Sequence, residues 1–320
     1  MSKRKLVITQ NIHQELQAKI KALIPEWEII SGKDPETWKE HLNHAEVIVG
    51  WKKEIKENCL EQNSSLRWLQ SWSAGVDSLP LHNMKERDIL LTTASGVHAY
   101  PISETIFSLM LALTRKIHTY IKNQQIKKWH HENLSLEIHG KTIGIVGVGA
   151  IGKETAKIAK AFNMKVIGIR QSDKSEEDFD KVYNMMHINS VLPLCDYIVV
   201  TAPLTSETYY MFSKDQFQLM KDTAIFINIG RGEIVNEDDL IHALETKQIA
   251  GAGLDVFEKE PLLENSPLWN FENVIITPHT AGSTEHYESR VIEDIFIPNL
   301  KHYLQKGVPS TNLVNYEKGY

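Results

Sequence analysis

Short apolar segments and longer polar or amphipathic segments alternate along almost the whole chain. In the first hundred residues, five apolar stretches of strand length stand at residues 6–8, 27–30, 47–49, 67–71 and 89–92. Residues 11–23 have the spacing of an amphipathic helix, and helical or polar segments separate the later stretches as well. Alternation of this kind predicts a parallel sheet whose strands are joined by crossover helices.

The alternation resumes after a long, mostly helical stretch between Gly96 and Lys141. Within it, residues 101–116 open with proline at a helix start and carry a wide apolar face, so we expect this helix to connect two domains. Beyond it, further strands are predicted at residues 164–169, 181–183, 197–201, 223–229, 251–256 and 273–277. With helices between most of them, these strands match a doubly wound sheet.

A glycine-rich turn opens this second half. A short apolar strand at residues 141–146 leads directly into Gly147-x-Gly149-x-x-Gly152, and a helix-like pattern follows. Gly147 permits the tight turn, Gly149 lets a pyrophosphate approach the backbone, and Gly152 lets the helix pack close to the strand. The alternative is a tight turn that binds nothing, but the position between strand and helix favours a dinucleotide site at the positive end of the helix.

Size, composition and charge narrow the class of protein. The chain has 320 residues, enough for about two domains, with 42% hydrophobic residues, 24% charged residues and a net charge of −6. This charge gives no reason to expect nucleic-acid or membrane binding. Cys59 and Cys195 lie far apart and lack metal-ligand spacing, so we expect no metal site and reduced thiols, with Cys195 filling the core. The apolar segment after the basic residues 1–5 is too short for a signal sequence, which predicts a cytoplasmic protein.

Three polar residues follow three different strands of the second half. Arg231 stands between two glycines, Glu260 precedes a proline, and His279 follows the last predicted strand. Ligands of doubly wound folds bind outside the carboxyl ends of the strands, so these side chains should reach the same rim as the glycine turn. Separately, each has a simpler interpretation, namely an exposed strand-end arginine, a solvated turn glutamate and a packing or helix-capping histidine.

Together, the three residues suit one chemistry. An arginine can hold a carboxylate through two charge-assisted hydrogen bonds, and a histidine beside a carboxylate can pass a proton near neutral pH. A nicotinamide cofactor would supply the hydride. The set therefore predicts reversible reduction of a 2-oxo acid.

The second strand after the glycine turn indicates which nicotinamide cofactor is bound. An acid at its end would accept the ribose hydroxyls of NAD, whereas an arginine accommodates the 2′-phosphate of NADP. Here the residue is Arg170, 18 positions after Gly152, and the neutral residues Gln171 and Ser172 follow. The pattern favours NADP, with NAD as the alternative. Arg170 could instead be a strand-end residue paired with an acid of residues 173–180.

These motifs resemble the D-isomer-specific 2-hydroxyacid dehydrogenases, a family that includes glyoxylate/hydroxypyruvate reductases and phosphoglycerate dehydrogenase. The likeness extends over residues 45–306. It implies that Arg231 binds and polarises the 2-oxo acid, that His279 is the general acid/base, and that Glu260 pairs with His279. It also implies a homodimer formed mainly through the cofactor domain.

The resemblance further assigns binding positions. The loop at residues 73–77 would bind the substrate carboxylate, the loop at 203–208 would flank the cofactor, and Asp255 would lie near the nicotinamide amide. The expected substrate-binding residues are Ser73, Ala74, Gly75, Val76, Arg231 and His279. The expected cofactor-binding residues are Gly147, Gly149, Ala150, Ile151, Gly152, Arg170, Gln171, Ser172, Thr201, Ala202, Pro203, Thr208, Ile229, Gly230, Arg231, Asp255, His279, Ala281 and Gly282.

The resulting expectation is an α/β protein of two Rossmann-like domains. A flavodoxin-like substrate domain would comprise residues 1–98 and 285–320, and a doubly wound dinucleotide-binding domain of residues 99–284 would be inserted in it. The predicted function is NAD(P)-dependent reduction of small 2-oxo acids, such as glyoxylate or hydroxypyruvate, to D-2-hydroxy acids. The alternatives are a relative acting on another acid such as 3-phosphoglycerate, and a nucleotide-sensing binding protein without turnover.

Overall fold

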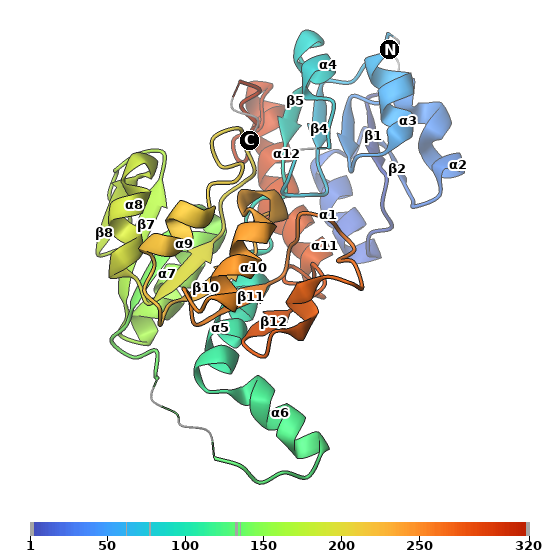
Figure 1. Cartoon of the computed structure of the whole chain (residues 1–320). Coiled ribbons are helices and arrows are strands. Elements are labelled where there is room, and N and C mark those ends of the chain that lie inside the picture. The colour runs from blue at the N-terminus through green and yellow to red at the C-terminus, as the bar shows by residue number, and fades with distance from the viewer. Residues whose placement is uncertain (1–2, 62, 77, 132–133, 135, 318–320) are drawn as a thin grey trace. The chain divides into compact units, whose positions relative to one another are not determined.

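The chain folds into two α/β units, each built on one parallel sheet (Figure 1). The computed structural model describes residues 3–61, 63–76, 78–131, 134 and 136–317. Unit 1 comprises Met1–Val97 and Thr284–Tyr320, and unit 2 comprises His98–Ser283. The predicted fold class is confirmed, and every strand that the apolar pattern predicts is present.

The sheet of unit 1 has the strand order β2-β1-β3-β4-β5 with all strands parallel, which is the order of flavodoxin-like folds. Its strands are β1 (Lys5–Ile8), β2 (Glu28–Ser31), β3 (Val47–Val49), β4 (Trp68–Gln70) and β5 (Leu90–Thr92). Successive side chains of a strand point to opposite faces, so Val7 joins one buried cluster while Leu6 and Ile8 join another. Both faces of this sheet are therefore covered.

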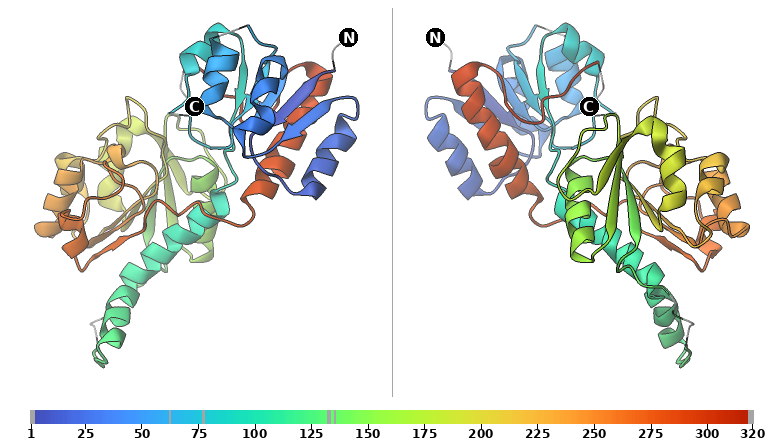
Figure 2. Two further views of the ribbon diagram at one scale, coloured as in Figure 1. Left: turned by 90° about the vertical axis from the view of Figure 1, so that its right-hand side faces the viewer. Right: turned by 90° about the vertical axis from the view of Figure 1, so that its left-hand side faces the viewer.

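The helices of unit 1 come from both ends of the chain. They are α1 (Gln14–Leu23), α2 (Pro35–Trp38), α3 (Lys53–Ile55), α4 (Leu81–Glu86), α11 (Tyr287–Ser289) and α12 (Ile297–Lys306), with a 3₁₀ segment at Lys39–His44 and π segments at Lys56–Leu60 and Arg290–Phe296. The last helical segment, from Tyr287 to Lys306, is thus interrupted by a π segment. Phe296 and Tyr303 each lie 5.3 Å, centroid to centroid, from the Trp68 ring of the sheet. Figure 2 shows this returning segment beside the first strands.

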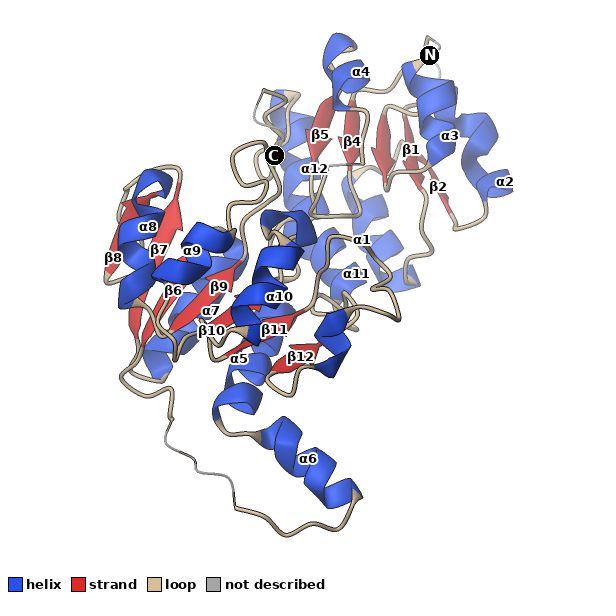
Figure 3. Cartoon of the chain, in the orientation of Figure 1, coloured by secondary structure: helices blue, strands red, loops and turns tan. Residues whose placement is uncertain are grey.

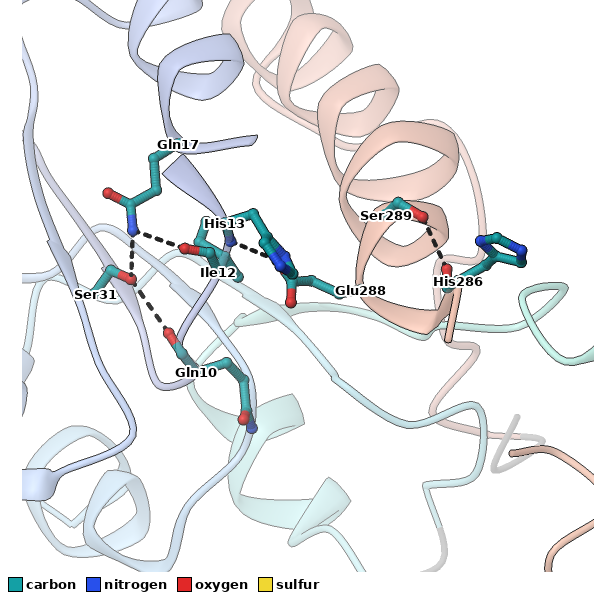
Figure 4. A network of polar contacts seen from close by, with 8 residues as sticks. All are labelled: Gln10, Ile12, His13, Gln17, Ser31, His286, Glu288 and Ser289. Atoms are coloured by element: carbon teal, nitrogen blue, oxygen red, sulfur yellow. Dashed lines mark hydrogen bonds and ion pairs between the residues drawn. The ribbon is translucent and has the colours of Figure 1, made fainter. Parts of the chain in front are cut away.

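A polar network also ties the returning segment to the start of the chain (Figure 4). Oε1 of Glu288 accepts a hydrogen bond of 2.6 Å from the backbone N–H of His13 and lies 2.9 Å from Nδ1 of the same residue. His13 precedes α1 and provides no side-chain cap to that helix. Nearby, Ser31 donates to the carbonyl of Gln10 at 3.2 Å. Residues 275 positions apart in sequence therefore stabilise the same corner of unit 1.

The sheet of unit 2 has the order β12-β11-β10-β9-β6-β7-β8, again with all strands parallel. Its strands are β6 (Thr142–Val146), β7 (Lys165–Arg170), β8 (Lys181–Asn184), β9 (Tyr197–Val200), β10 (Ile225–Asn228), β11 (Gly251–Leu254) and β12 (Val274–Ile276). The chain runs outward from β6 through β7 to β8, then returns to β9 on the other side of β6. The strand order reverses at β6, and in open sheets ligands bind at such a point.

Helices cover both faces of the unit 2 sheet. They are α5 (Ala99–Thr114), α6 (Ile117–Gln125), α7 (Ala150–Ala161), α8 (Ile188–Val191), α9 (Lys214–Leu219) and α10 (Glu237–Glu245), with 3₁₀ segments at Met185–His187, Leu192–Leu194, Gly232–Ile234 and Pro267–Asn270. Helices α5 and α7 share one buried cluster with alternate residues of the strands, and residues of α10 join the other. As predicted for its apolar context, Cys195 is buried in the core, and burial raises the pKa of its thiol to about 12.

The stretch between Gly96 and Lys141 differs from the prediction. Helix α5 begins at Ala99, directly after the boundary between the units, and α6 ends at Gln125. The described residues from 126 to 141 are not helical. Lys127 has a φ of +55°, in the left-handed region, which ends the helix there. The expectation of a mostly helical stretch is therefore wrong for its second half. Within the described residues, no helix has both the length and the apolar character needed to cross a membrane.

Candidate active site

The glycine turn joins β6 to α7 at the point where the strand order of unit 2 reverses. Gly147 has a φ of +105°, and a Cβ there would lie 2.7 Å from the backbone nitrogen of Ala202. A Cβ on Gly152 would lie 2.1 Å from the carbonyl oxygen of Gly147. A Cβ on Gly149, by contrast, would meet no described atom within 4 Å. Two glycines are thus required by close packing, and the third leaves open space at the start of α7.

This open space suits a dinucleotide. Gly149 is the N-cap of α7 and provides no side-chain hydrogen bond to the first turn. The N–H groups of that turn and the positive end of the helix favour an anion such as a pyrophosphate. The residues of the turn therefore fit the expected cofactor.

Two threonine hydroxyls hold the loop beside the turn. Thr201 donates to the carbonyl of Gly147 at 2.8 Å. Thr208 is buried, donates to the carbonyl of Pro203 at 2.7 Å and accepts from the backbone N–H of Thr205 at 2.8 Å. Both threonine side chains bind within the protein, so they shape the backbone of the loop that follows β9.

Arg231 stands in a turn that an asparagine holds at the end of β10. The side-chain amide of Asn228 donates to the carbonyl of Arg231 at 3.0 Å, and its oxygen accepts from the N–H of Gly230 at 3.1 Å. A Cβ on Gly232 would lie 1.9 Å from the carbonyl carbon of Phe257. The turn carrying Arg231 is therefore packed directly on the loop that follows β11 and contains Glu260.

His279 and Glu260 are brought together from the ends of β12 and β11. Nδ1 of His279 lies 2.6 Å from Oε2 of Glu260, and the other oxygen, Oε1, accepts from the backbone N–H of Phe257 at 3.1 Å. An ionised carboxylate only accepts hydrogen bonds, so Nδ1 carries the hydrogen in this contact. The second ring nitrogen, Nε2, is then the one available to exchange a proton with a ligand. The His279 side chain is about half exposed.

Asp255 holds the loop that carries His279. Its side chain is buried; Oδ1 accepts from the hydroxyl of Thr277 at 2.5 Å and from the N–H of Thr280 at 3.0 Å, and Oδ2 accepts from the N–H of Ala281 at 3.0 Å. Its carbonyl accepts from the N–H of His279 at 2.9 Å. Both carboxylate oxygens thus bind to the loop, which fixes the backbone on either side of the histidine.

Arg170 ends β7, and the following loop surrounds its guanidinium. Nη1 lies 3.2 Å from Oε2 of Glu176, Nε donates to the carbonyl of Ser172 at 3.4 Å, and Nη2 donates to the carbonyl of Lys174. Lys153, in the first turn of α7, lies 2.9 Å from the same Oε2 of Glu176. Hydrogen bonds from Lys153 and then Arg170 hold the pKa of the Glu176 carboxyl below its usual range. The pairing of Arg170 with an acid, left open by the sequence, is present.

The predicted substrate loop belongs to unit 1, where it follows β4. The N–H of Ser73 donates to the hydroxyl of Ser71 at 3.0 Å, and the carbonyl of Ser73 accepts from the N–H of Ala94 at 3.0 Å. Val76 is buried, and Ala74 and Gly75 are half-buried. The last residue of the quoted motif, residue 77, lies outside the described residues.

The other predicted residues lie at the carboxyl ends of the unit 2 strands, and Arg231, Glu260 and His279 follow the adjacent strands β10, β11 and β12. Sequence reasoning missed Asn228, which shapes the Arg231 turn, and the roles of Lys153 and Glu176. The pattern Asn228-x-Gly230 after a buried strand is a signal for a side-chain-held turn. Nothing in the sequence distinguishes Glu176 from the acidic residues beside it.

Comparison with known proteins places this geometry in a family. Residues 107–281 match the model of the D-isomer specific 2-hydroxyacid dehydrogenase NAD binding domain. The chain is 33% identical to glyoxylate reductase of Pyrococcus horikoshii over 329 residues, which covers 98% of this chain and 97% of that protein.

Two solved structures resemble the whole chain. A D-isomer specific 2-hydroxyacid dehydrogenase family protein from Aeromonas salmonicida is 32% identical with a TM-score of 0.85, covering 98% of this chain and 100% of that one. The NADPH-dependent glyoxylate/hydroxypyruvate reductase of Sinorhizobium meliloti, in complex with NADP and sulfate, is 27% identical with a TM-score of 0.82, covering 99% and 100%.

Proposed function

Because the chain belongs to the D-isomer specific 2-hydroxyacid dehydrogenase family, we propose that it reduces glyoxylate, hydroxypyruvate or a similarly small 2-oxo acid, with His279 as the proton donor. The protein is an oxidoreductase of this family, and its reaction class is NAD(P)-dependent reduction of 2-oxo acids. The choice of small acids follows the relatives, which are glyoxylate and glyoxylate/hydroxypyruvate reductases.

The observation that carries the role of His279 is the 2.6 Å contact between its Nδ1 and Oε2 of Glu260. This contact orients the ring and leaves Nε2 as the nitrogen that can exchange a proton with substrate. When bound, a reduced nicotinamide cofactor supplies the hydride. Arg231 holds the substrate carboxylate through charge-assisted hydrogen bonds and polarises the 2-oxo group. As C2 gains a hydride, the proton on Nε2 of His279 passes to the developing alkoxide and completes the hydroxyl group.

The surrounding residues act on these groups indirectly. Glu260 stabilises the ring while it is charged and returns it to the same orientation for each turnover. Asp255 is a positioning residue, since it holds the backbone on both sides of His279. The backbone amides of Gly75 and Val76 are proposed to bind the substrate carboxylate as well.

We propose NADP as the preferred cofactor. Arg170 ends β7, the strand next to β6, which is where an arginine can pair with a 2′-phosphate. Gln171 and Ser172, which follow it, carry no negative charge that would repel this phosphate. The similar reductase of Sinorhizobium meliloti has NADP bound, and this supports the same assignment.

We also propose that the enzyme is a homodimer through unit 2. Helix α6 extends away from the sheet of its own unit (Figures 1 and 3). Ile117 and Ile121, which share one face of that helix, are 47% and 52% exposed, and Trp129 beyond it is 92% exposed. Apolar side chains gathered on a projecting helix are typical of a surface that another chain covers, and the proposed occupant is a second copy of this chain.

The test is a panel of 2-oxo acids assayed with NADPH and with NADH by loss of absorbance of the reduced nicotinamide. We expect glyoxylate or hydroxypyruvate with NADPH to have the highest kcat/KM. The panel includes 3-phosphohydroxypyruvate, the oxidised form of 3-phosphoglycerate. A preference for it would replace the proposed substrate with a phosphorylated acid. Tight binding of NADPH without turnover of any acid would make the protein a nucleotide sensor.

A further inference from the structure

One carboxylate oxygen is shared by two cations beside the glycine turn. Oε2 of Glu176 lies 2.9 Å from Nζ of Lys153 and 3.2 Å from Nη1 of Arg170. Lys153 follows Gly152 directly, and Arg170 ends the strand next to β6. The cluster therefore stands where the adenosine end of a dinucleotide is expected in a doubly wound fold.

The charges of this cluster would affect how a cofactor phosphate binds. Arg170 and Lys153 are the kind of pair that binds a phosphate group, one as a planar donor and the other as a point charge. Glu176 supplies the negative charge that a phosphate would otherwise bring. Its side chain is 22% exposed and that of Arg170 is 19% exposed, so water screens this pair only in part.

Fold stability gives little reason for this arrangement. Ion pairs near the surface contribute little to the free energy of unfolding, and the chain between Arg170 and Glu176 is a loop rather than a helix or strand. Specificity, by contrast, is often built from a repulsive element as well as an attractive one.

We propose that Glu176 is a specificity-determining residue for the cofactor: its carboxylate occupies Arg170 and Lys153, and the 2′-phosphate of NADPH must displace it. Glu176 thereby reduces the preference for NADPH over NADH that Arg170 creates. The inference deepens the proposed preference for NADP and rests on it.

The test compares the dissociation constants of NADPH and NADH, measured by fluorescence titration of the whole protein, for wild type and Glu176→Gln. Glutamine keeps the length and an oxygen acceptor but removes the charge. We expect NADPH to bind about fivefold more tightly, the size of one partly screened charge interaction, while NADH binding changes less than twofold. Glu177→Gln is the matched control, since it removes the same charge from the exposed neighbour and should change neither constant.

Two further measurements locate the effect. Calorimetry with adenosine 2′-monophosphate and adenosine 5′-monophosphate should show tighter binding of the 2′-phosphate alone in Glu176→Gln. Glu176→Gln should also be added to Arg170→Ala. The resulting gain in NADPH affinity should be less than half the gain that Glu176→Gln gives in wild type, because the competition acts partly through Arg170. Thermal unfolding checks that each variant is folded, and Glu176→Ala provides a second variant in which the same direction is expected.

An unchanged or weaker affinity for NADPH in Glu176→Gln and Glu176→Ala would overturn the inference, as would an equal gain in Glu177→Gln. These measurements need no turnover. A selectivity shift in a protein that reduces no 2-oxo acid would contradict the proposed reaction and leave the role of Glu176 in place. Turnover of glyoxylate without a change in cofactor selectivity would support the proposed reaction and contradict the role of Glu176.

Discussion

Glu260 and His279, which are 19 positions apart in sequence, meet through a 2.6 Å contact between Oε2 and Nδ1. The carboxylate is itself held, because its other oxygen accepts from the backbone of its own loop. The contact holds the ring in one tautomer and leaves Nε2 as the atom proposed to exchange the proton.

Replacing His279 tests this assignment most directly. His279→Gln should lower kcat for reduction by about 10²–10⁴, because the glutamine amide is too weak an acid to donate a proton to the alkoxide. The variant should still bind NADPH, because the substitution leaves the glycine turn unchanged. Steady-state kinetics together with NADPH titration provide the measurement. A variant that keeps the wild-type kcat would exclude His279 as the proton donor.

Substrate binding by Arg231 should depend on the planar geometry of its guanidinium more than on its positive charge. Arg231→Lys keeps the positive charge but replaces a planar pair of donors with a point charge, so a bidentate contact to the substrate carboxylate is lost. We expect kcat/KM for the 2-oxo acid to fall about 10- to 100-fold, the contribution of one charge-assisted hydrogen bond. Arg87→Lys in unit 1, another half-exposed arginine, is the control and should behave as wild type. Equal kinetics for both variants would contradict the substrate role.

Arg170 should distinguish the two cofactors. Arg170→Ala removes the guanidinium that is proposed to bind the 2′-phosphate, so the dissociation constant of NADPH should rise about tenfold or more while that of NADH changes little. Titration of NADPH and of NADH into the variant gives the ratio of the two dissociation constants. If both constants rise equally, Arg170 only holds the loop at residues 172–176.

The exposed face of α6 should control the oligomeric state. Ile121→Glu places a charge on the apolar face, and burying it against a second copy would be unfavourable, so the dimer should dissociate. Size-exclusion chromatography with light scattering measures the mass. Lys122→Glu introduces the same side chain at an exposed position about 100° further around the helix and should leave the dimer intact. A wild-type mass equal to one chain would contradict the proposed assembly.

Glu237 links pH to stability in unit 2. Its carboxylate accepts from the N–H of Glu258 at 3.3 Å, and Oε1 of Glu258 accepts from the N–H of Glu237 at 2.8 Å. Burial, and then the nearby Glu258 charge, raise the pKa of Glu237. The folded state therefore binds this proton more tightly than the unfolded state, and ionisation destabilises the fold as pH rises through the folded pKa.

Glu237→Gln should accordingly raise Tm at neutral pH, and the gain should disappear as pH falls below the ordinary pKa of a glutamate. We expect a gain in Tm of about 1–2 °C at neutral pH, a small value because solvent screens a half-buried carboxylate. Thermal unfolding at several pH values measures it, with Glu245→Gln at the exposed end of α10 as the control. A gain that is the same at acidic and neutral pH would rule out this explanation.

The strands were predictable because each sheet is buried on both faces. A strand such as β9, in which every residue is buried, must be a continuous apolar run, and such runs stand out between polar segments. The glycine turn was predictable for a similar reason: the close contacts at Gly147 and Gly152 admit no side chain. The end of α6 at Gln125 was not predictable, because a single left-handed residue such as Lys127 ends a helix without a distinctive sequence signal.

The sequence by itself determined the two parallel α/β sheets, the glycine turn and the presence of Arg231, Glu260 and His279 after successive strands, since these depend on local periodicity and on residues whose spacing is read directly. Only the tertiary structure decided which partners the polar side chains take. Asp255 binds the loop of His279, and Glu176 binds Lys153 and Arg170, because hydrogen bonds and ion pairs depend on distances of a few ångströms between loops that the periodicity of the chain does not specify.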